Sequence, residues 1–419
     1  MRILHLVHQY PPHHIGGTEL YTQNLARRQA LAGHNVAVFA PVPETSPPAK
    51  VLSNGVRVYG VPTGERSRLQ VFYHSFRQPS VRRALQEVIE HERPDLVHVQ
   101  HLMGLPLGLI EDLRQARVPY VVTLHDYWYV CANAQLVTNT DQSICAGPDA
   151  GARNCARCAL ARAGLPSAGG LAPLAAPIFR NRNQRLRDVL AGAARVIAPT
   201  QFVYKTYEQL GIAAANMSVV RHGIELPEAA VREARAAHVA RPRGGPLRVG
   251  YVGSVAWQKG LHVLIDAVNE LPPDDVQLTI YGGLDGFPDY VAALEASIRH
   301  RSIRLAGRVA REDLWQALAA LDVVVLPTLW YEASPLTIDE VFAVGVPIVA
   351  SQIGAMTEKI ANGVNGYLFP PAAPLALSQI LQTLQAEPGR LERLEGGIGP
   401  VRTLAEHMVD VENIYRSAL

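Results

Sequence analysis

The sequence predicts two α/β domains, each a doubly wound parallel sheet with helices on both faces. The chain has 419 residues, which is more than a single hydrophobic core usually supports. Short apolar runs rich in valine and isoleucine alternate with longer helical patterns, as is typical of strands buried in a parallel sheet. The two halves also begin alike, with an apolar run, a glycine-containing loop and a helical pattern.

The apolar runs are the expected strands. In the first half they are Ile3–Val7, Val36–Ala40, Val56–Val61, Leu96–Val99, Tyr120–Leu124 and Val196–Ala198. In the second half they are Arg248–Val252, Val276–Tyr281, Ile303–Leu305, Val323–Leu326 and Pro347–Ala350. We interpret residues 227–246, a polar helical pattern followed by a Pro/Gly-rich run, as a linker. The predicted domains are then residues 1–226 and 247–400, and a last helix in 401–419 is expected to pack back on the first domain. Two such domains would leave a cleft between their strand ends, where sheets of this kind bind ligands.

The composition excludes several classes of protein. The chain has 39 Lys+Arg and 37 Asp+Glu residues, and this near-balance argues against nucleic acid as the main partner. No apolar run approaches the roughly 20 residues of a membrane span. The apolar N-terminus is too short, and too interrupted by histidine, for a signal peptide. Because the four cysteines are not in a pattern that forces a secreted framework, we expect a cytoplasmic protein.

The segment that ends at Glu340 is the most informative part of the sequence. After a buried strand, Ser334 and Pro335 predict a helix start, with Ser334 as the N-cap and Pro335 as the first helical residue. Such a helix start presents free N–H groups and a partial positive charge, which suit a diphosphate. Glu340 would lie about 9 Å further along the helix, at an apolar surface where a carboxylate needs a partner. The alternative is that Glu332 is an ordinary loop carboxylate and Glu340 a solvated helix residue.

With these residues the sequence resembles glycosyltransferase family 4, retaining enzymes of the GT-B fold with two Rossmann-like domains. The resemblance covers essentially the whole chain and rests on Glu332-x7-Glu340, Ala343-x-Gly345-x-Pro347-x-Val349, and Glu358 with Asn362-Gly363-x-Asn365-Gly366. It implies that Glu340 binds the ribose hydroxyls of a nucleotide sugar, and that Glu332 holds hydroxyls of the transferred sugar near the reacting carbon. The backbone of Ser334, Pro335, Leu336 and Thr337 would contact the sugar and the diphosphate.

A departing nucleoside diphosphate gains negative charge, which cations, helix dipoles or a metal must stabilise. Lys259 can supply one ammonium group. A lysine at a helix start is often only solvated, but lysine is rare in this chain and the resemblance places a phosphate-binding residue here. The family usually has an arginine where this chain has Ser254. Arg308 could replace that cation, although by resemblance its position more often flanks the base. Because there is no Asp-x-Asp motif, we expect transfer without a divalent metal ion.

The first domain contributes weaker signals. Gly16 and Gly17 follow the first strand, where small residues let a phosphate approach; a lone glycine pair is usually just a turn, but the resemblance places this loop beneath the donor diphosphate. His125 follows another buried strand and could simply be packed in the core. The resemblance places it beside the transferred sugar. Four further histidines are guesses for the acceptor side: His13, His14, His98 and His101.

The chemistry we expect is same-face substitution with retained anomeric configuration, in which the leaving phosphate accepts the acceptor's proton. Glu332 then positions the sugar and stabilises charge, because no pair of carboxylates is required as acid and base. The expected donor is a UDP- or GDP-linked sugar, and the expected acceptor is a glycan or a lipid-linked glycan in polysaccharide biosynthesis. Such an enzyme is a hexosyltransferase.

All four cysteines of the chain lie in an expected insertion at about 127–180. Cys131, Cys145, Cys155 and Cys158, with a C-x2-C pair at the end, suit a tetrahedral structural zinc site. Unbound buried thiols, disulfides and an iron–sulfur cluster are the alternatives. The following apolar stretch and the arginines Arg180, Arg182, Arg185 and Arg187 could contact anionic lipid or a lipid-linked acceptor at the membrane. The alternative is a lid loop followed by a solvated basic helix.

Two other functions compete with sugar transfer. A nucleotide-sugar 2-epimerase shares the two-domain architecture but acts on the donor alone. A zinc-braced sugar-nucleotide-binding protein without catalysis would fit the departure at Ser254 and the insertion. The sequence argues against a nicotinamide dehydrogenase, because no G-x-G-x-x-G follows the first strand of either half.

Overall fold

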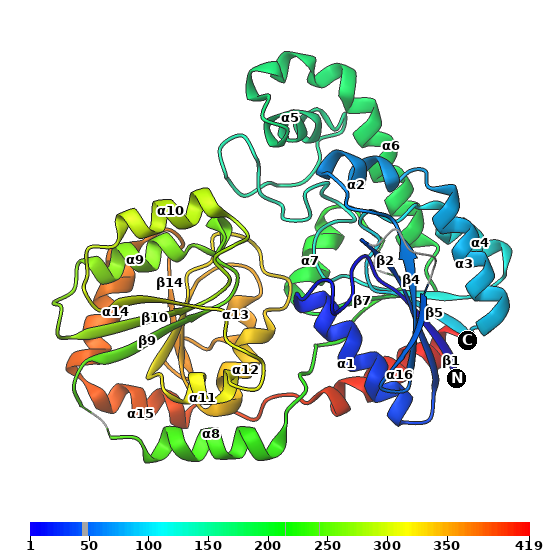
Figure 1. The fold of residues 1–419 in the computed structure, drawn as a ribbon. Helices are drawn as coiled ribbons and strands as arrows, with labels where there is room; N and C mark the ends of the chain where they lie inside the picture. Colours follow the sequence, from blue (N-terminus) through cyan, green and yellow to red (C-terminus); the bar gives the residue numbers. More distant parts are fainter. Residues whose placement is uncertain (44–48, 214, 243) are drawn as a thin grey trace. The chain divides into compact units, whose positions relative to one another are not determined.

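A computed structural model describes residues 1–43, 49–213, 215–242 and 244–419 of the protein. The chain forms two compact units (Figure 1). Unit 1 comprises Met1–His222 together with Leu404–Leu419, and unit 2 comprises Gly223–Thr403. Each unit is an α/β fold on a largely parallel sheet, which confirms the predicted fold class.

The sheet of unit 1 has eight strands in the order β3-β4-β2-β1-β5-β6-β7-β8. They are β1 (Arg2–Leu6), β2 (Asn35–Val42), β3 (Ala49–Ser53), β4 (Val56–Pro62), β5 (Leu96–Val99), β6 (Tyr120–Thr123), β7 (Arg195–Ala198) and β8 (Met217–Val219). Only β3 and β4 pair antiparallel; the other neighbours are parallel. All six strands expected in this half are present. The two edge strands β3 and β8 are additional, and β8 is too short to leave an apolar run in the sequence.

The helices of unit 1 are α1 (Gly17–Leu31), α2 (Arg68–His74), α3 (Pro79–Glu92), α4 (Gly108–Gln115), α5 (Arg153–Arg162), η1 (Pro166–Leu171), α6 (Ala172–Ala191), α7 (Gln201–Gln209) and α16 (Leu404–Ala418). The C-terminal helix α16 belongs to this unit although it follows unit 2 in the sequence. Its buried residues Leu404, His407, Val411 and Tyr415 recur at helical spacing on one face. Val411 and Tyr415 join the core formed with β1 and α1.

The sheet of unit 2 has six parallel strands in the order β11-β10-β9-β12-β13-β14. They are β9 (Leu247–Val252), β10 (Val276–Tyr281), β11 (Ile303–Gly307), β12 (Val323–Leu326), β13 (Ile348–Ser351) and β14 (Gly366–Phe369). The five expected strands are present and β14 is additional. It begins with Gly366, where a Cβ would lie 2.1 Å from the carbonyl oxygen of Ile348, so a glycine is needed for the strands to meet.

The helices of unit 2 are α8 (Glu228–Ala240), η2 (Trp257–Lys259), α9 (Leu261–Asn269), α10 (Pro288–Ser297), α11 (Leu314–Ala319), α12 (Leu336–Val344), α13 (Met356–Lys359), α14 (Pro374–Ala386) and α15 (Pro388–Gly396). The stretch 227–246, expected to be a linker, contains α8, which packs against α11 and α12. Its residues Ala234 and His238 are buried. The boundary between the compact units therefore lies before this stretch, between His222 and Gly223.

Both sheets have a point where the strand order reverses. In unit 1 the chain passes from β1 to β2 on one side and later places β5 on the other side. In unit 2 the same reversal separates β9 from β12. Loops that leave adjacent strands in opposite directions open a crevice beyond their carboxyl ends, which is the usual ligand position in such sheets. Among the helices that the structure describes, none combines the length and apolar content that crossing a bilayer requires.

Candidate functional site

In unit 2, the two loops at the reversal point are bonded to each other. The N–H of Leu329, after β12, donates to the carbonyl oxygen of Gln258, after β9, over 2.9 Å. Gly260 has φ +70° and its missing Cβ would lie 1.9 Å from the carbonyl oxygen of Pro327. Both the left-handed backbone and this close approach require glycine. The loop that carries Lys259 is thereby fixed against the loop that carries Glu332.

Lys259 and Glu332 form an ion pair at this point. The Nζ of Lys259 lies 2.5 Å from Oε1 of Glu332, and the indole Nε1 of Trp330 donates to the same oxygen over 2.7 Å. Nζ is also 5.4 Å from the centre of the Trp330 ring, within cation–π range. Glu332 is buried, whereas the Lys259 side chain is partly exposed. The structure thus brings two sequence-predicted site residues together, and adds Trp330, which the sequence analysis missed.

The start of α12 differs from the prediction by one residue. The helix begins at Leu336 with Pro335 as its N-cap, and no side chain caps it. Ser334, predicted as the N-cap, precedes the cap, and its buried Oγ has no hydrogen-bond partner. Proline lacks a capping side chain, so the N–H groups of the first turn, which include Leu336 and Thr337, are left uncapped by side chains. An anion is the natural ligand for such groups.

Two charged pairs lie on α12. Glu340 pairs with Arg311, which also stands over the Trp315 ring at 5.6 Å. Burial raises the pKa of Glu340, and the Arg311 charge opposes that rise. Asp339 pairs with Lys359 over 2.5 Å, and the Lys359 Nζ is also 3.3 Å from the carbonyl oxygen of Pro335.

Lys359 therefore places a second cation beside the start of α12. Lys359 was not among the predicted site residues. The signal that could have found it is its place directly after Glu358 of the family motif, in a chain with few lysines. Glu358 itself is exposed. Two of the scarce lysines, Lys259 and Lys359, are thus found in this part of unit 2.

Ser254, which stands where the family usually has an arginine, and Arg308, which could replace that cation, bond to residues outside the ion pairs described above. Ser254 is exposed, and its backbone oxygen accepts from the buried Tyr251 hydroxyl over 2.7 Å. Arg308 pairs with Asp285 over 2.7 Å, and both side chains are largely exposed. An ion pair that is so exposed to water contributes little to the stability of the fold.

In unit 1, the start of α1 holds a buried carboxylate. Gly16 is the N-cap, and a Cβ there would lie 2.5 Å from Oε2 of Glu19, so glycine leaves room for this side chain to fold back. Burial raises the pKa of Glu19, and hydrogen bonds from the backbone of Gly16 and Glu19 oppose the rise. The Nε2 of His8 lies 3.6 Å from Oε1 of Glu19. Gly17 has open space where a Cβ would be.

Two histidines follow neighbouring strands of unit 1. His101, after β5, has Nε2 at 3.0 Å from Oδ2 of Asp126 and accepts from the Met103 N–H at Nδ1 over 3.1 Å. His125, after β6, has Nε2 at 2.7 Å from Oε1 of Gln100. Burial lowers the pKa of His125 to about 3, so its ring is neutral at neutral pH.

The three other histidines predicted for the acceptor side differ in their exposure. His13 and His14 are exposed on the loop before α1. His98, in contrast, is fully buried within β5 and bonds to Tyr415 and Thr123, so its assignment to the acceptor side is wrong. Its side chain lies on the face of the sheet that α16 covers, which the sequence of β5 could not reveal.

The cysteine insertion has little regular structure before α5. Cys131 and Cys145 lie in its loops, whereas Cys155 and Cys158 lie on α5, and none forms a disulfide. Burial, with the three other cysteines as further causes, raises the pKa of the Cys155 thiol to about 12. Within the described residues, no three His, Cys, Asp or Glu side chains are arranged to hold a metal ion.

Arg182 anchors this insertion to the rest of unit 1. It is 2% exposed, donates to the carbonyl oxygen of Trp128 over 2.6 Å, and stands 5.0 Å from the centre of the Trp128 ring. Its expected exposure to lipid is therefore wrong. A helical arginine at this position faces inward because α6 packs one side against the segment after β6.

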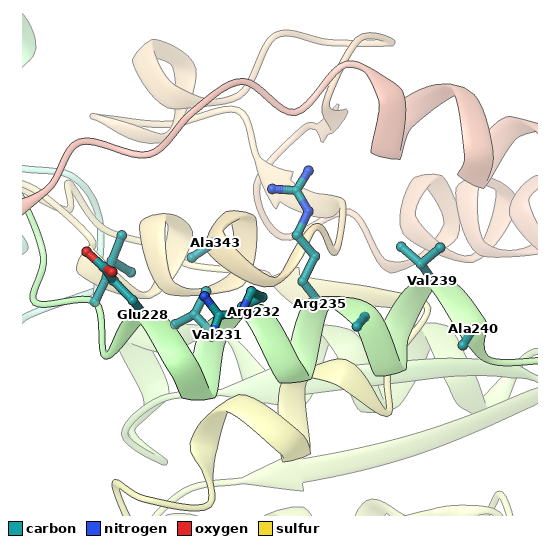
Figure 2. Close-up of a pocket in the computed structure, with 9 residues that line it drawn as sticks. Glu228, Val231, Arg232, Arg235, Val239, Ala240 and Ala343 are labelled. Carbon is teal, nitrogen blue, oxygen red and sulfur yellow. The ribbon is translucent and has the colours of Figure 1, made fainter.

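A groove of about 670 Å³ runs along α8 of unit 2. Figure 2 shows the α8 side chains around it together with Ala343 of α12. The lining is mostly apolar, and its charged members are Glu228, Arg232 and Arg235. It includes none of the sequence-predicted site residues, and its one lining residue from a loop after a strand is Leu226, which follows the edge strand β8. The candidate site is therefore at the reversal points of the sheets and not in this groove.

Comparisons with known proteins cover both units. Residues 15–228 match the family described as Glycosyltransferase Family 4, and residues 246–387 match Glycosyl transferases group 1. The D-inositol 3-phosphate glycosyltransferase of Xylanimonas cellulosilytica is 26% identical, over 91% of this chain and 86% of that protein. The glycogen synthase of Mycobacterium tuberculosis is also 26% identical, over 94% of this chain and 88% of its own.

Solved structures of the same fold span the whole chain. The sucrose-phosphate synthase of Thermosynechococcus elongatus has a TM-score of 0.76 at 19% identity, covering 99% of this chain and 98% of its own. The Anabaena protein HepE, solved in complex with UDP and glucose, has a TM-score of 0.68 at 19% identity, covering 100% of both chains. At this identity the likeness concerns the fold.

Proposed function

The chain belongs to glycosyltransferase family 4, and from this premise we propose that it moves a sugar from a nucleotide diphosphate sugar to a glycan or lipid-linked acceptor with retention of configuration. That the protein is a glycosyltransferase of the GT-B fold follows from the family matches and the fold. The observation that carries the finer proposal is the Lys259–Glu332 pair at the reversal point of unit 2. An ammonium group and a carboxylate side by side suit a ligand with an anionic diphosphate and a hydroxyl-bearing sugar.

The proposal assigns the donor to residues of unit 2. The diphosphate binds to Lys259 and to the uncapped backbone of Ser334, Pro335, Leu336 and Thr337, with Lys359 as a further cation. The hydroxyls of the transferred sugar bind to Glu332, and the ribose hydroxyls bind to Glu340. Support comes from the uncapped start of α12 and from the buried carboxylate of Glu340, which lies on the same helix. Ser254 and Arg308 keep lesser roles beside the phosphate and the base.

In the reaction, the bond between the anomeric carbon and the diphosphate oxygen breaks while the acceptor oxygen bonds to the same face of that carbon. The proton of the acceptor hydroxyl passes to an oxygen of the leaving phosphate. Lys259, Lys359 and the helix start stabilise the charge that develops there, so the proposal adds no metal ion. Glu332 orients the sugar and favours positive charge at the reacting carbon. From unit 1, the proposal adds Gly16 and Gly17 for the diphosphate and His125 for the sugar.

The donor base and sugar are tested first with UDP-glucose, because HepE was solved in complex with UDP and glucose. GDP-mannose and UDP-N-acetylglucosamine complete the first panel. Purified protein is incubated with each donor, with and without a mixture of sugar and lipid-linked acceptors, and the products are analysed by mass spectrometry and NMR. An acceptor-dependent product with retained configuration supports the proposal. Conversion of the donor without acceptor would instead identify an epimerase, and inverted configuration would contradict retention.

We also propose that the four cysteines bind a structural zinc ion. Supporting this, none of the four cysteines forms a disulfide, and Cys131, Cys145 and Cys158 add to the effect of burial in raising the pKa of the Cys155 thiol. Cys131, Cys145, Cys155 and Cys158 would hold the ion as thiolates, which binding must deprotonate. The ion would draw the loops of the insertion onto α5 and would take no part in sugar transfer.

Finally, we propose that the insertion contacts an anionic membrane that carries a lipid-linked acceptor. Four apolar side chains on the turn before η1, on η1 and on α6 are each more than half exposed: Leu165, Leu171, Leu174 and Ile178. Residues 150–187 contain seven arginines and no acidic residue, and Arg153, Arg157, Arg162 and Arg180 are exposed. Exposed leucines beside exposed arginines are the composition of a surface that enters the headgroup region of anionic lipid. Figure 1 shows α5 and the start of α6 beyond the strands of unit 1, where a membrane could reach them.

A further inference from the structure

A continuous series of hydrogen bonds crosses the interior of unit 1 and ends at His125. Its links are His125 Nε2 to Gln100 Oε1 (2.7 Å), Gln100 Nε2 to His5 Nδ1 (3.0 Å), His5 Nε2 to Gln29 Oε1 (2.7 Å), Gln29 Nε2 to Tyr415 Oη (3.1 Å), Tyr415 Oη to His98 Nδ1 (2.6 Å) and His98 Nε2 to Thr123 Oγ1 (2.7 Å). Every member except His125 is fully buried. The members lie on β1, α1, β5, β6 and α16 or, for Gln100 and His125, in the segments that follow β5 and β6. The series therefore joins the C-terminal helix to the sheet.

Each link in this series fixes the direction of the next one. A carboxamide oxygen can only accept, so Nε2 of His125 donates to Gln100, and Nε2 of His5 donates to Gln29. A neutral imidazole carries one proton, so Nδ1 of His5 is bare and accepts from the amide of Gln100. The amide of Gln29 donates to Tyr415, whose single proton goes to Nδ1 of His98.

The three histidine rings of the series are neutral. Burial lowers the pKa of His5 to about 4 and that of His125 to about 3, and it lowers the pKa of His98 well below its usual value. Each neutral ring carries one proton, and every bonded group of the series except His125 is fully buried, so no member can reverse its bond alone without losing a partner. A reversal needs all six links to turn over together, because any partial reversal leaves a buried group unpaired.

The last free position in the series is Nδ1 of His125. Its Nε2 carries the proton that bonds to Gln100, so Nδ1 is bare and can only accept. No described residue forms a hydrogen bond with Nδ1, and the His125 side chain is only partly buried. This nitrogen therefore offers an acceptor to a ligand hydroxyl and cannot donate to a phosphate or glycosidic oxygen.

We infer that Gln100, His5, Gln29 and Tyr415 are positioning residues that hold His125 as an acceptor for a hydroxyl of the transferred sugar. The inference rests on the proposed role of His125 at the donor sugar. It makes the C-terminal helix part of the site through Tyr415, which lies 386 positions from its partner Gln29. It also limits the choice of donor, because a sugar with a hydroxyl at the facing position is bound better than its deoxy analogue.

A second contact from the same helix supports His125 from the side. Nδ1 of His407 lies 2.8 Å from the carbonyl oxygen of Arg221 and donates to it, and Nε2 of His407 lies 2.7 Å from the Tyr21 hydroxyl. The Tyr21 ring then meets the His125 ring at 4.9 Å with an interplanar angle of 65°. The ring of His125 is thus held at Nε2 by the series and is also in contact with the Tyr21 ring.

The tautomer of His125 is measured directly by NMR on the full chain labelled with ¹⁵N-histidine. The side-chain nitrogen shifts separate a bare nitrogen from a protonated one, and the His125→Gln variant identifies the His125 signals. We expect a bare Nδ1 and a protonated Nε2 in His125, His5 protonated at Nε2, and no change in these forms between pH 6 and pH 8. A proton on Nδ1 of His125 would overturn the inference.

Kinetics test whether the series acts through His125. Tyr415→Phe removes only the hydroxyl, and we expect it to lower kcat/KM for the donor about tenfold. The matched control is Tyr120→Phe, which removes a buried hydroxyl bonded to the Val189 carbonyl oxygen outside the series, and we expect no comparable loss. In a His125→Ala background, Tyr415→Phe should cost less than about twofold. An equal loss in both backgrounds would mean that Tyr415 acts only on the fold, and would overturn the inference.

These readouts separate the inference from the proposed function. The NMR result does not depend on the donor, so it decides the tautomer even if no tested sugar is transferred. If Nδ1 is bare but His125→Ala retains full activity, the role of His125 in the proposed function is wrong while the buried series stands.

Discussion

The Nζ of Lys259 lies 2.5 Å from Oε1 of Glu332, a carboxylate 73 positions further along the chain. The two residues follow different strands of unit 2, and the bonded loops after β9 and β12 bring them together. In the proposed reaction they act at neighbouring parts of the donor, the lysine at the diphosphate and the carboxylate at the sugar. The first prediction follows from this pair.

Removing either charge of the pair should slow sugar transfer much more than it weakens the fold. We expect Lys259→Ala and Glu332→Gln each to lower kcat/KM by about 10²–10³, because each removes a charge that stabilises the transition state. Initial rates from product mass spectrometry check this. Lys205→Ala, at an exposed lysine of α7, serves as the control and should keep the parent rate. Rates within twofold of the parent for both site variants would exclude the assigned roles.

Glu340 is expected to govern donor binding. Glu340→Ala removes the proposed ribose contact and leaves Arg311 without its partner, so we expect the Kd for UDP-glucose, or for the donor that the panel identifies, to rise about 10- to 100-fold. Isothermal titration calorimetry measures it. Glu312→Ala, at an exposed carboxylate next to Arg311, should leave the Kd unchanged. Equal affinity of the Glu340→Ala variant and the parent would count against the ribose contact.

The exposed leucines of the insertion should bind anionic lipid. We expect the parent to float with vesicles of phosphatidylglycerol and phosphatidylcholine but not with phosphatidylcholine alone, and to detach as the salt concentration rises. The double variant Leu171→Glu with Leu174→Glu should lower partitioning at least about tenfold, because two apolar side chains no longer enter the lipid. Leu375→Glu, at a similarly exposed leucine of α14, is the control. Equal flotation of the double variant and the parent would refute this surface.

The cysteine insertion should contain about one zinc ion per chain, as a four-cysteine site requires. Metal analysis of the purified protein measures the zinc, and Cys155→Ser with Cys158→Ser should remove it and lower the unfolding temperature. A parent protein without zinc, or one whose four thiols are linked in disulfides on non-reducing mass analysis, contradicts the zinc proposal. Sugar transfer should persist in the double variant, because the ion has no catalytic role.

Stability should fall as the pH is lowered below about 6.5 because of the buried histidines. His5 and His125 have pKa values of about 4 and about 3 in the folded protein, whereas an unfolded histidine has a pKa of about 6.5. Between these values the unfolded chain binds more protons, so the stability is complete above pH 6.5 and is lost as the pH falls toward 4. Each such histidine contributes about 1.4 kcal/mol per pH unit in that window. Calorimetric unfolding temperatures between pH 7.5 and pH 5 test this, and constant values would contradict it.

Much of the fold could be predicted from the sequence. The buried strands of parallel sheets leave continuous apolar runs, so all eleven expected strands are present, and only β3, β8 and β14 had to be added from the structure. These three lie at sheet edges, where no long apolar run is needed. The helix after β12 was expected as well, but its start was misplaced by one residue, because the sequence does not show whether the backbone at Pro335 is already helical.

The candidate site was predicted unevenly. Glu332, Lys259 and Glu340 could be named from motif and spacing, since their positions after strand ends or on an adjoining helix are local features. Trp330, Lys359, Arg311 and Glu19 were missed, because their contacts join segments that the sequence does not relate. The patterns around His98 and Arg182 were misleading, since a polar residue in a strand or helix can face either side.

By itself, the sequence determined which segments form strands and helices, and which residues follow the strand ends, because hydrophobic periodicity and turn chemistry are local properties of the chain. Only the tertiary structure decided which polar side chains are partners. Lys259 meets Glu332, and Tyr415 meets Gln29, through packing between elements distant in sequence. A buried polar group must find its partner wherever the fold places one, and that location is set by the packing of the whole unit.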